Sequence, residues 1–169
     1  MKGQYQHLQR EFGPVYDGRS RVLILGSFPS AKSREANFYY GHPRNRFWPL
    51  MGRLLGCEIP SGREEKAALM LRHRIALWDS IDSCDIIGSS DSSIRNAVPV
   101  DIQRVLDAAD IRLLCANGAA SARVYQKYLQ PLTGREIVTL PSTSPANAAW
   151  SLDRLYEEWR QLLPVLRED

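Results

Sequence analysis

Two stretches of the sequence combine polar, cationic and aromatic residues in a way that suits a ligand site. The first begins with GSFPS (26–30) and continues with FYYGHPRNRFW (38–48), and the second is LPSTSP (140–145). The cations among the rings of the first stretch suit phosphate contacts combined with base stacking: Lys32, Arg34, Arg44, Arg46 and Arg53. On composition alone, a solvated basic face over a small aromatic core explains the pattern equally well.

The same stretches lack the signatures of several enzyme classes. Neither contains a GxxxxGK[ST] phosphate loop, and no GxGxxG fingerprint follows the first apolar run, which weighs against an NTPase or a dinucleotide enzyme. The three histidines, His7, His42 and His73, show no metal-ligand spacing, and the three scattered cysteines exclude a site built from cysteine alone. We therefore expect no metal and no cofactor.

Positive charge is concentrated at the front of the chain. Residues 1–60 hold nine Lys and Arg against four Asp and Glu, although the net charge of the whole chain is only +3. This distribution predicts salt-sensitive contacts with an anionic partner. Because the sequence has no run of roughly 18 apolar residues and no signal-peptide pattern, we expect a cytoplasmic protein with no membrane contact.

Apolar runs and amphipathic stretches predict the elements that must position these residues. The runs 21–26, 75–78, 111–116 and 136–140 are expected to form strands. Helical spacing marks 47–55, a segment ending near His73, 102–109, a segment carrying Ala122, Tyr125 and Leu129, and 152–163. A long loop is expected up to about Asn45, and the Ser- and Asp-rich 79–98 segment is expected to be an extended connection.

The alternation of strands and helices predicts an α/β fold. We expect a three-layer α/β/α sandwich around a central four-stranded parallel sheet, in one domain covering residues 1–169. Sheets of this kind bind ligands at the carboxyl ends of their strands. The loops after Gly26, Trp78, Ala116 and Leu140 are therefore the expected site.

The two chemically rich stretches resemble the uracil-DNA glycosylase superfamily, whose members carry a glycine-rich motif after one strand and a Pro-Ser motif after the last. The string GHPRNRFWPLMGRLLG (41–56) is similar to the mismatch-specific uracil/thymine DNA glycosylases. GSFPS (26–30) together with FYYGHPRN (38–45) most resembles the hypoxanthine-DNA (deoxyinosine) glycosylase branch. The resemblance covers about residues 20–163 and implies a uracil-DNA glycosylase-like fold with damaged DNA as the partner.

Two positions depart from the uracil-acting members of that superfamily. Phe28 stands where those members have an Asp or Asn that positions water, and Leu140 stands where they have a His or Asn that donates to the pyrimidine O2. Hypoxanthine has no oxygen at C2, so a polar donor there would be left unsatisfied and an apolar residue fits better. Without the resemblance, both residues are explained as core residues at strand ends.

The resemblance to the hypoxanthine branch implies that Asn45 takes the catalytic role. Its amide could hold a water against C1′ or hydrogen-bond the sugar or the leaving base. Asn45 also directly precedes a predicted helix, where a capping Asn is favoured, and one residue can do both. Asp79, after the second strand, is the second choice, although hydrogen bonds within a Ser- and Asp-rich loop also explain it.

The expected base-binding residues are Ser27, Phe28, Tyr40, His42 and Leu140. Tyr40 resembles the stacking aromatic of the mismatch glycosylases, and the alternative is a core tyrosine under the loop. His42 could hydrogen-bond a base or a phosphate.

The expected DNA-binding residues are cationic, carry hydroxyls or lie at the tip of the second loop: Lys32, Arg44, Arg46, Ser142, Thr143, Ser144, Ala146 and Asn147. The hydroxyls and backbone N–H groups of 142–144 would meet phosphates. Ala146 and Asn147 are candidates for the wedge that fills the gap left by a flipped nucleotide. A helix-entry turn with a capping Asn or Ser explains this loop as well.

Together these features predict a monomeric, monofunctional DNA glycosylase of base excision repair. The expected reaction hydrolyses the N-glycosidic bond of deoxyinosine, releases hypoxanthine and leaves an abasic site. Among the lysines only Lys32 lies in a candidate site loop, which disfavours lysine-mediated strand cleavage. The alternatives are a uracil or mismatch-specific DNA glycosylase, or a non-catalytic DNA- or nucleotide-binding member of the same fold.

Overall fold

A parallel sheet stands at the centre of the computed structural model, which describes residues 3–168. Its four strands follow the order β3-β2-β6-β7, and every neighbouring pair is parallel. The strands are β2 (Val22–Gly26), β3 (Ile75–Asp79), β6 (Leu113–Asn117) and β7 (Val138–Leu140). The two strands β2 and β3 are almost entirely buried and apolar, as strands covered on both faces must be.

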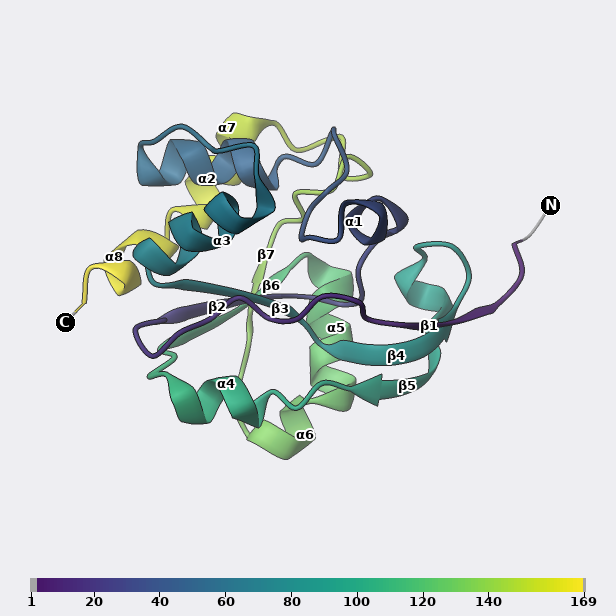
Figure 1. Ribbon diagram of the computed structural model, residues 1–169. Coiled ribbons are helices and arrows are strands. Elements are labelled where there is room, and N and C mark those ends of the chain that lie inside the picture. The colour runs from purple at the N-terminus through teal and green to yellow at the C-terminus, as the bar shows by residue number, and fades with distance from the viewer. Residues whose placement is uncertain (1–2, 169) are drawn as a thin grey trace.

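Helices cover both faces of this sheet, as Figure 1 shows. One side carries α1 (Ala31–Ala36), α2 (Phe47–Leu55), α3 (Arg63–Arg72), α7 (Leu152–Trp159) and α8 (Leu162–Leu166). The opposite side carries α4 (Gln103–Ala108), α5 (Ala119–Tyr128) and α6 (Gln130–Thr133). The predicted three-layer α/β/α sandwich with a four-stranded parallel sheet is therefore confirmed.

A second, antiparallel sheet stands beside the first and was not predicted. It has the order β1-β4-β5 and consists of β1 (Gln6–Gln9), β4 (Ile81–Ile86) and β5 (Arg95–Pro99), with the 3₁₀ turn Asp91–Ser93 between the last two. The expectation of an irregular connection over 79–98 is thus wrong. β4 pairs with the N-terminal strand, which lies far away in the sequence, so local composition carried no signal for it.

Two smaller differences concern helices. The expected long loop before Asn45 contains the six-residue helix α1, which Ser30 caps by accepting a hydrogen bond from the Ser33 N–H. The expected final helix is divided into α7 and α8, with the break at Arg160 and Gln161.

Trp159 joins the main core to the second chemically rich loop. Its side chain is fully buried, its ring packs edge-on against Phe47 at a centroid distance of 6.1 Å, and its indole N–H donates to the Pro141 carbonyl at 2.9 Å. The contact between α2 and α7 therefore holds Trp159 in place, and Trp159 in turn holds the loop after β7.

We expect Trp159→Ala to lower the free energy of unfolding by about 3–5 kcal/mol, because it empties a core site and leaves the Pro141 carbonyl without its donor. Urea denaturation followed by circular dichroism measures this. The matched variant Leu132→Ala removes an apolar side chain that is 72% exposed, and its midpoint should stay close to that of the wild type. Equal losses in the two variants would contradict the anchoring role of Trp159.

Candidate active site

A cavity of about 180 Å³ opens at the carboxyl edge of the parallel sheet. All four central strands contribute to it, through Asp79 of β3, Gly26 and Ser27 at the end of β2, Asn117 of β6, and Ser142 to Ser144 after β7. Other lining residues come from the surrounding loops, the 3₁₀ turn, α1 and α5: Phe12, Phe28, Pro29, Ser30, Ser33, Tyr39, Tyr40, Asn45, Ser89, Asp91 and Ser121. The space is below the roughly 300–1,000 Å³ of drug-sized ligand pockets, which suits one planar ring system.

Asn45 is held in one orientation by two donors. Its Oδ1 accepts from the Phe47 backbone N–H at 2.9 Å and from the Thr143 hydroxyl at 2.8 Å. A backbone N–H can only donate, so the amide oxygen must face it, and at the cavity wall the Nδ2 amino group has no hydrogen-bond partner within residues 3–168. The N-cap position of α2 belongs to Arg46, which has no side-chain cap hydrogen bond, so the expectation of Asn45 as the capping residue is not met. Asn45 instead accepts from the N–H of Phe47, the first helical residue, and the same hydrogen bonds fix its amide donor.

Asn117 ties Thr143 to the sheet. The Asn117 Nδ2 donates to the Thr143 hydroxyl and the Asn117 Oδ1 accepts from the Thr143 backbone N–H, both at 3.0 Å. Thr143 is fully buried and Asn117 is 9% exposed. Asn117, Thr143 and Asn45 thus form one chain of hydrogen bonds from the end of β6 to the start of α2, which we call the amide latch.

Tyr40 forms the wall beside Asn45. Its backbone has φ of 56°, the left-handed region that non-glycine residues seldom adopt, and its ring stacks on Phe47 with centroids 3.9 Å apart. Its buried hydroxyl makes no hydrogen bond of good geometry among residues 3–168. Burial, and after it the nearby Asp79 charge, raises the pKa of Tyr40, while the Asn117 side chain close to the hydroxyl opposes this rise. Backbone strain and an unpaired buried hydroxyl are both more common at functional sites than in plain cores.

An ion pair lies at the opposite side of the cavity from the amide latch. The Arg10 guanidinium donates to Asp79 Oδ2 at 2.6 Å, and the two side chains are only 4% and 8% exposed. Arg10 also donates to the Tyr39 hydroxyl at 3.0 Å and to the Phe12 carbonyl at 3.1 Å. Burial is the largest single influence and lowers the pKa of Arg10, but the charge and hydrogen bond of Asp79, together with Tyr39 and Asp82, outweigh it and raise the pKa overall.

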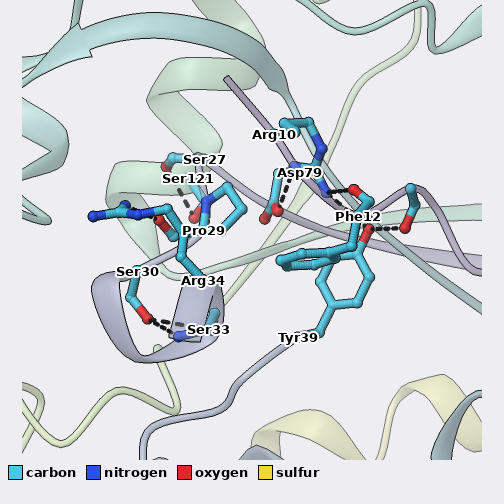
Figure 2. Close-up of polar contacts among 11 residues, drawn as sticks. Arg10, Phe12, Ser27, Pro29, Ser30, Ser33, Arg34, Tyr39, Asp79 and Ser121 are labelled. Carbon is cyan, nitrogen blue, oxygen red and sulfur yellow. Dashed lines mark hydrogen bonds and ion pairs between the residues drawn. The ribbon is translucent and has the colours of Figure 1, made fainter. Parts of the chain in front are cut away.

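Figure 2 shows Asp79 between Pro29 on one side and Phe12 with Tyr39 on the other. Asp79 Oδ1 accepts no hydrogen bond from the described part of the chain and lies over Gly26, where an added Cβ would come within 2.3 Å of it. Gly26 therefore leaves room for the carboxylate. The cavity has a free amide donor at its β7 side and a free carboxylate acceptor at its β3 side.

The predicted base-binding residues divide into two groups. Ser27 and Phe28 line the cavity with Tyr40: the Ser27 hydroxyl donates to Asp91 Oδ2 at 2.9 Å, and Phe28 is 7% exposed and also packs in a small second core. Burial raises the pKa of Asp91, the nearby Asp79 charge adds to this rise, and the Ser27 hydrogen bond opposes it. His42 lines a neighbouring cavity instead.

Leu140 requires a correction. It is 1% exposed, belongs to the main core and is absent from the lining of the cavity. The last residue of β7 points into the core, and the chain reaches the cavity only from Ser142 onward. We therefore withdraw Leu140 from the base-binding set and leave Phe28 as its apolar member.

Arg46 has a role that the sequence analysis missed. Its guanidinium donates to the backbone carbonyls of Thr143, Ser144, Asn147 and Trp150, so it fastens the loop after β7 to the start of α2. Most of its donors are used in this way, and the DNA contact expected of it stays a prediction.

The other predicted DNA-binding residues lie around the loop and on α1. Within the loop, the Ser142 hydroxyl accepts from the Ser144 N–H and the Asn147 amide donates to the Ser142 carbonyl, so these groups also build the turn. Ala146 is exposed at the tip. Arg44 is exposed, and exposed Lys32 pairs with Glu35 at 3.3 Å, so both cations stand on the surface.

Sequence reasoning overlooked Arg10, Phe12, Asp91 and Ser121 as parts of the site, whereas it placed the loop after Ala116, which begins with Asn117, at the site. Arg10 is 69 positions from Asp79 and nothing local indicated their contact. Among residues 3–168 there is no cluster of three His, Cys, Asp or Glu side chains that could hold a metal ion. None of the helices within that range has the length and apolar character needed to cross a bilayer.

We expect Arg10→Ala to lower the free energy of unfolding by about 3–5 kcal/mol, because it leaves the Asp79 carboxylate buried without its partner. Urea denaturation at neutral pH measures the loss. Arg53→Ala is the matched control, because it breaks an ion pair with Asp153 in which the side chains are 41% and 84% exposed, and it should cost no more than about 1 kcal/mol. If both variants unfolded alike, the buried pair would not be the stronger contact.

The chain is similar to proteins of one family over most of its length. The family model of the uracil DNA glycosylase superfamily matches residues 14–166. A hypoxanthine DNA glycosylase from Methanosarcina acetivorans is 36% identical over 154 residues, which cover 90% of this chain and 96% of that protein. One from Methanosarcina barkeri is 33% identical over 138 residues, which cover 80% and 86%.

A solved structure shares the fold. It is a solution NMR structure of a Methanosarcina acetivorans protein described as a candidate uracil DNA glycosylase, with a TM-score of 0.80 and 33% identity over 96% of this chain and 100% of that one. A family match over nearly the whole chain, supported by relatives above 30% identity at high coverage, establishes the relationship. This chain belongs to the uracil DNA glycosylase superfamily.

Proposed function

We propose that this protein is a monofunctional DNA glycosylase that releases hypoxanthine from deoxyinosine in DNA and leaves an abasic site. The observation that carries the proposal is the cavity itself, with a fixed amide donor at one side and a free carboxylate acceptor at the other. The similarity to two hypoxanthine DNA glycosylases over most of the chain supports it. We place this activity in a monomer in the cytoplasm that repairs damaged DNA without a metal or cofactor.

The reaction breaks the bond between C1′ and the base, and water supplies the new oxygen on C1′. Positive charge develops on the deoxyribose and negative charge on the departing base. Asn45 presents its Nδ2 amino group, because its Oδ1 is fully used by Thr143 and Phe47. A fixed N–H donor lowers the barrier most where negative charge develops, so we assign Asn45 to the leaving base.

We assign Asp79 to the edge of the base that lies away from the glycosidic bond. The strand order places β3 and β7 at the two sides of the sheet, so a base whose glycosidic side faces Asn45 would extend toward Asp79. Hypoxanthine carries a hydrogen on N1, which the free Asp79 oxygen can accept, whereas N1 of adenine is itself an acceptor. Two acceptors facing each other in a dry site are unfavourable, which accounts for rejection of the normal base.

Phe28, Phe12 and Tyr40 provide the apolar and aromatic walls that a flipped base requires. An apolar neighbour suits the C2–H of hypoxanthine, and with Leu140 in the core this role falls to Phe28. Ala146 at the exposed tip of the second loop is then the residue best placed to enter the gap in the duplex.

The test is single-turnover base release from duplexes that contain one deoxyinosine, deoxyuridine or deoxynebularine, a purine without O6 and N1–H. The wild type should act best on inosine. Asn45→Ala should slow release of hypoxanthine and purine alike, by roughly 10²–10³-fold. Asp79→Asn should slow inosine far more than nebularine, because only inosine offers the N1 hydrogen.

Three results would contradict the proposal. Release of uracil alone would make the protein a uracil DNA glycosylase, and no release of any base by a folded wild type would make it a binding protein. Equal loss on inosine and nebularine in Asp79→Asn would place Asp79 at the sugar or the water rather than at the base. Circular dichroism of each variant controls for folding.

A further inference from the structure

A second cavity lies against the first and has no place in the reaction described above. Its volume is about 520 Å³, and Tyr39, Tyr40 and Asn45 line both cavities. Its other walls come from the loop before α2, from α2 and from the start of α3, which lie together on one side of the sheet in Figure 1. A ligand there would be separated from the base site only by these three shared residues.

The lining of the second cavity is largely apolar and aromatic, and its charged side chains are all cationic. Arg63 and Lys66 belong to its lining, and no Asp or Glu does. Within residues 3–168 neither cation forms an ion pair, and the Lys66 ammonium lies 5.2 Å from the centre of the Trp48 ring. The neighbouring carboxylates Glu64 and Glu65 of α3 are exposed and do not line the space.

His42 adds a third donor. Its Nδ1 accepts the Arg44 backbone N–H at 3.0 Å, and this N–H can only donate. Of the two ring nitrogens, Nε2 therefore carries the hydrogen and is available to donate. Two cations and one N–H donor, with no carboxylate among them, match an anion with several acceptor oxygens.

We propose that this second cavity binds a phosphodiester of the DNA strand, next to the nucleotide whose base occupies the first cavity. The proposal rests on the function proposed above and extends it to the path of the backbone. Continuity through Tyr40 and Asn45 favours a polymer that passes from one cavity to the other. Because Arg63, Lys66 and His42 contact phosphate rather than bases, the site contributes affinity that does not depend on sequence.

The test compares the double variant Arg63→Ala/Lys66→Ala with Arg72→Ala, which removes a cation from the last turn of the same helix, away from the second cavity. Binding is measured with a duplex that holds a 2′-fluorinated, hydrolysis-resistant deoxyinosine. The double variant should bind roughly tenfold more weakly, and the slope of log K against log salt should become shallower by about 1–2. Arg72→Ala should leave both unchanged.

Replacing single phosphates beside the deoxyinosine by uncharged methylphosphonates locates the contact. At one flanking position the wild type should lose affinity, while the double variant should lose nothing further. In single-turnover release the double variant should need a higher enzyme concentration to reach its maximal rate, whereas in Asn45→Ala no enzyme concentration restores the rate. This difference separates the phosphate site from a failure of the proposed reaction.

Three outcomes would overturn the proposal. The first is that the double variant binds the duplex with the same affinity and the same salt slope as Arg72→Ala. The second is that, at every position, the loss of affinity from the methylphosphonate adds in full to the loss from the double variant. The third is competition by free deoxyinosine monophosphate that depends on Arg63 and Lys66 without any change in DNA binding, which would indicate a mononucleotide site instead.

Discussion

The hydrogen bond from the Thr143 hydroxyl to Asn45 Oδ1 joins two loops that are 98 positions apart in the sequence. One loop leaves β2 and leads into α2, and the other leaves β7 and leads into α7. The Asn117 side chain forms two hydrogen bonds with Thr143, and the Arg46 guanidinium donates to the backbone of the second loop. Without this link only the Phe47 N–H would hold the Asn45 amide, and the donor at this wall of the cavity would be less firmly oriented.

Burial gives the two sides of the cavity opposite electrostatic character. At the β7 side, an amide whose oxygen is fully used can only donate. At the β3 side, Arg10 neutralises one oxygen of Asp79 and leaves the other as an acceptor. Such groups act strongly because little water competes with them in a partly closed space. The mechanism we propose therefore depends on the orientation of these groups more than on a strong nucleophile.

The central sheet could be predicted from the sequence because its strands are short apolar runs that end where polar residues begin. The rule that ligands bind at strand ends found Ser27, Asp79 and the loop after Leu140, and the resemblance drew attention to Asn45. Leu140 was misplaced because the alternation of side chains along β7 turns it into the core. That detail depends on register, which composition does not determine.

Arg10 and the antiparallel sheet could not be predicted for a different reason. β1 pairs with β4, and Arg10 follows β1 directly. The pairing of these distant segments therefore positions the Arg10 guanidinium beside Asp79. The family model begins at residue 14, so this segment also lies outside the matched region. Contacts of this kind depend on tertiary structure alone and leave no periodic pattern in the local sequence.

The most direct test of this account is a double-mutant cycle on single-turnover hypoxanthine release, using Thr143→Val, Asn45→Ala and both together. Thr143→Val keeps the shape of the side chain and removes the hydroxyl that donates to Asn45 Oδ1 and accepts from Asn117 Nδ2, while the hydrogen bond from the Phe47 N–H to Asn45 remains. If the two residues act as one unit, Thr143→Val should slow release at least about tenfold, and the double variant should be no slower than Asn45→Ala alone. Wild-type release by a folded Thr143→Val, or losses that multiply in the double variant, would contradict the claim that the latch positions the catalytic amide.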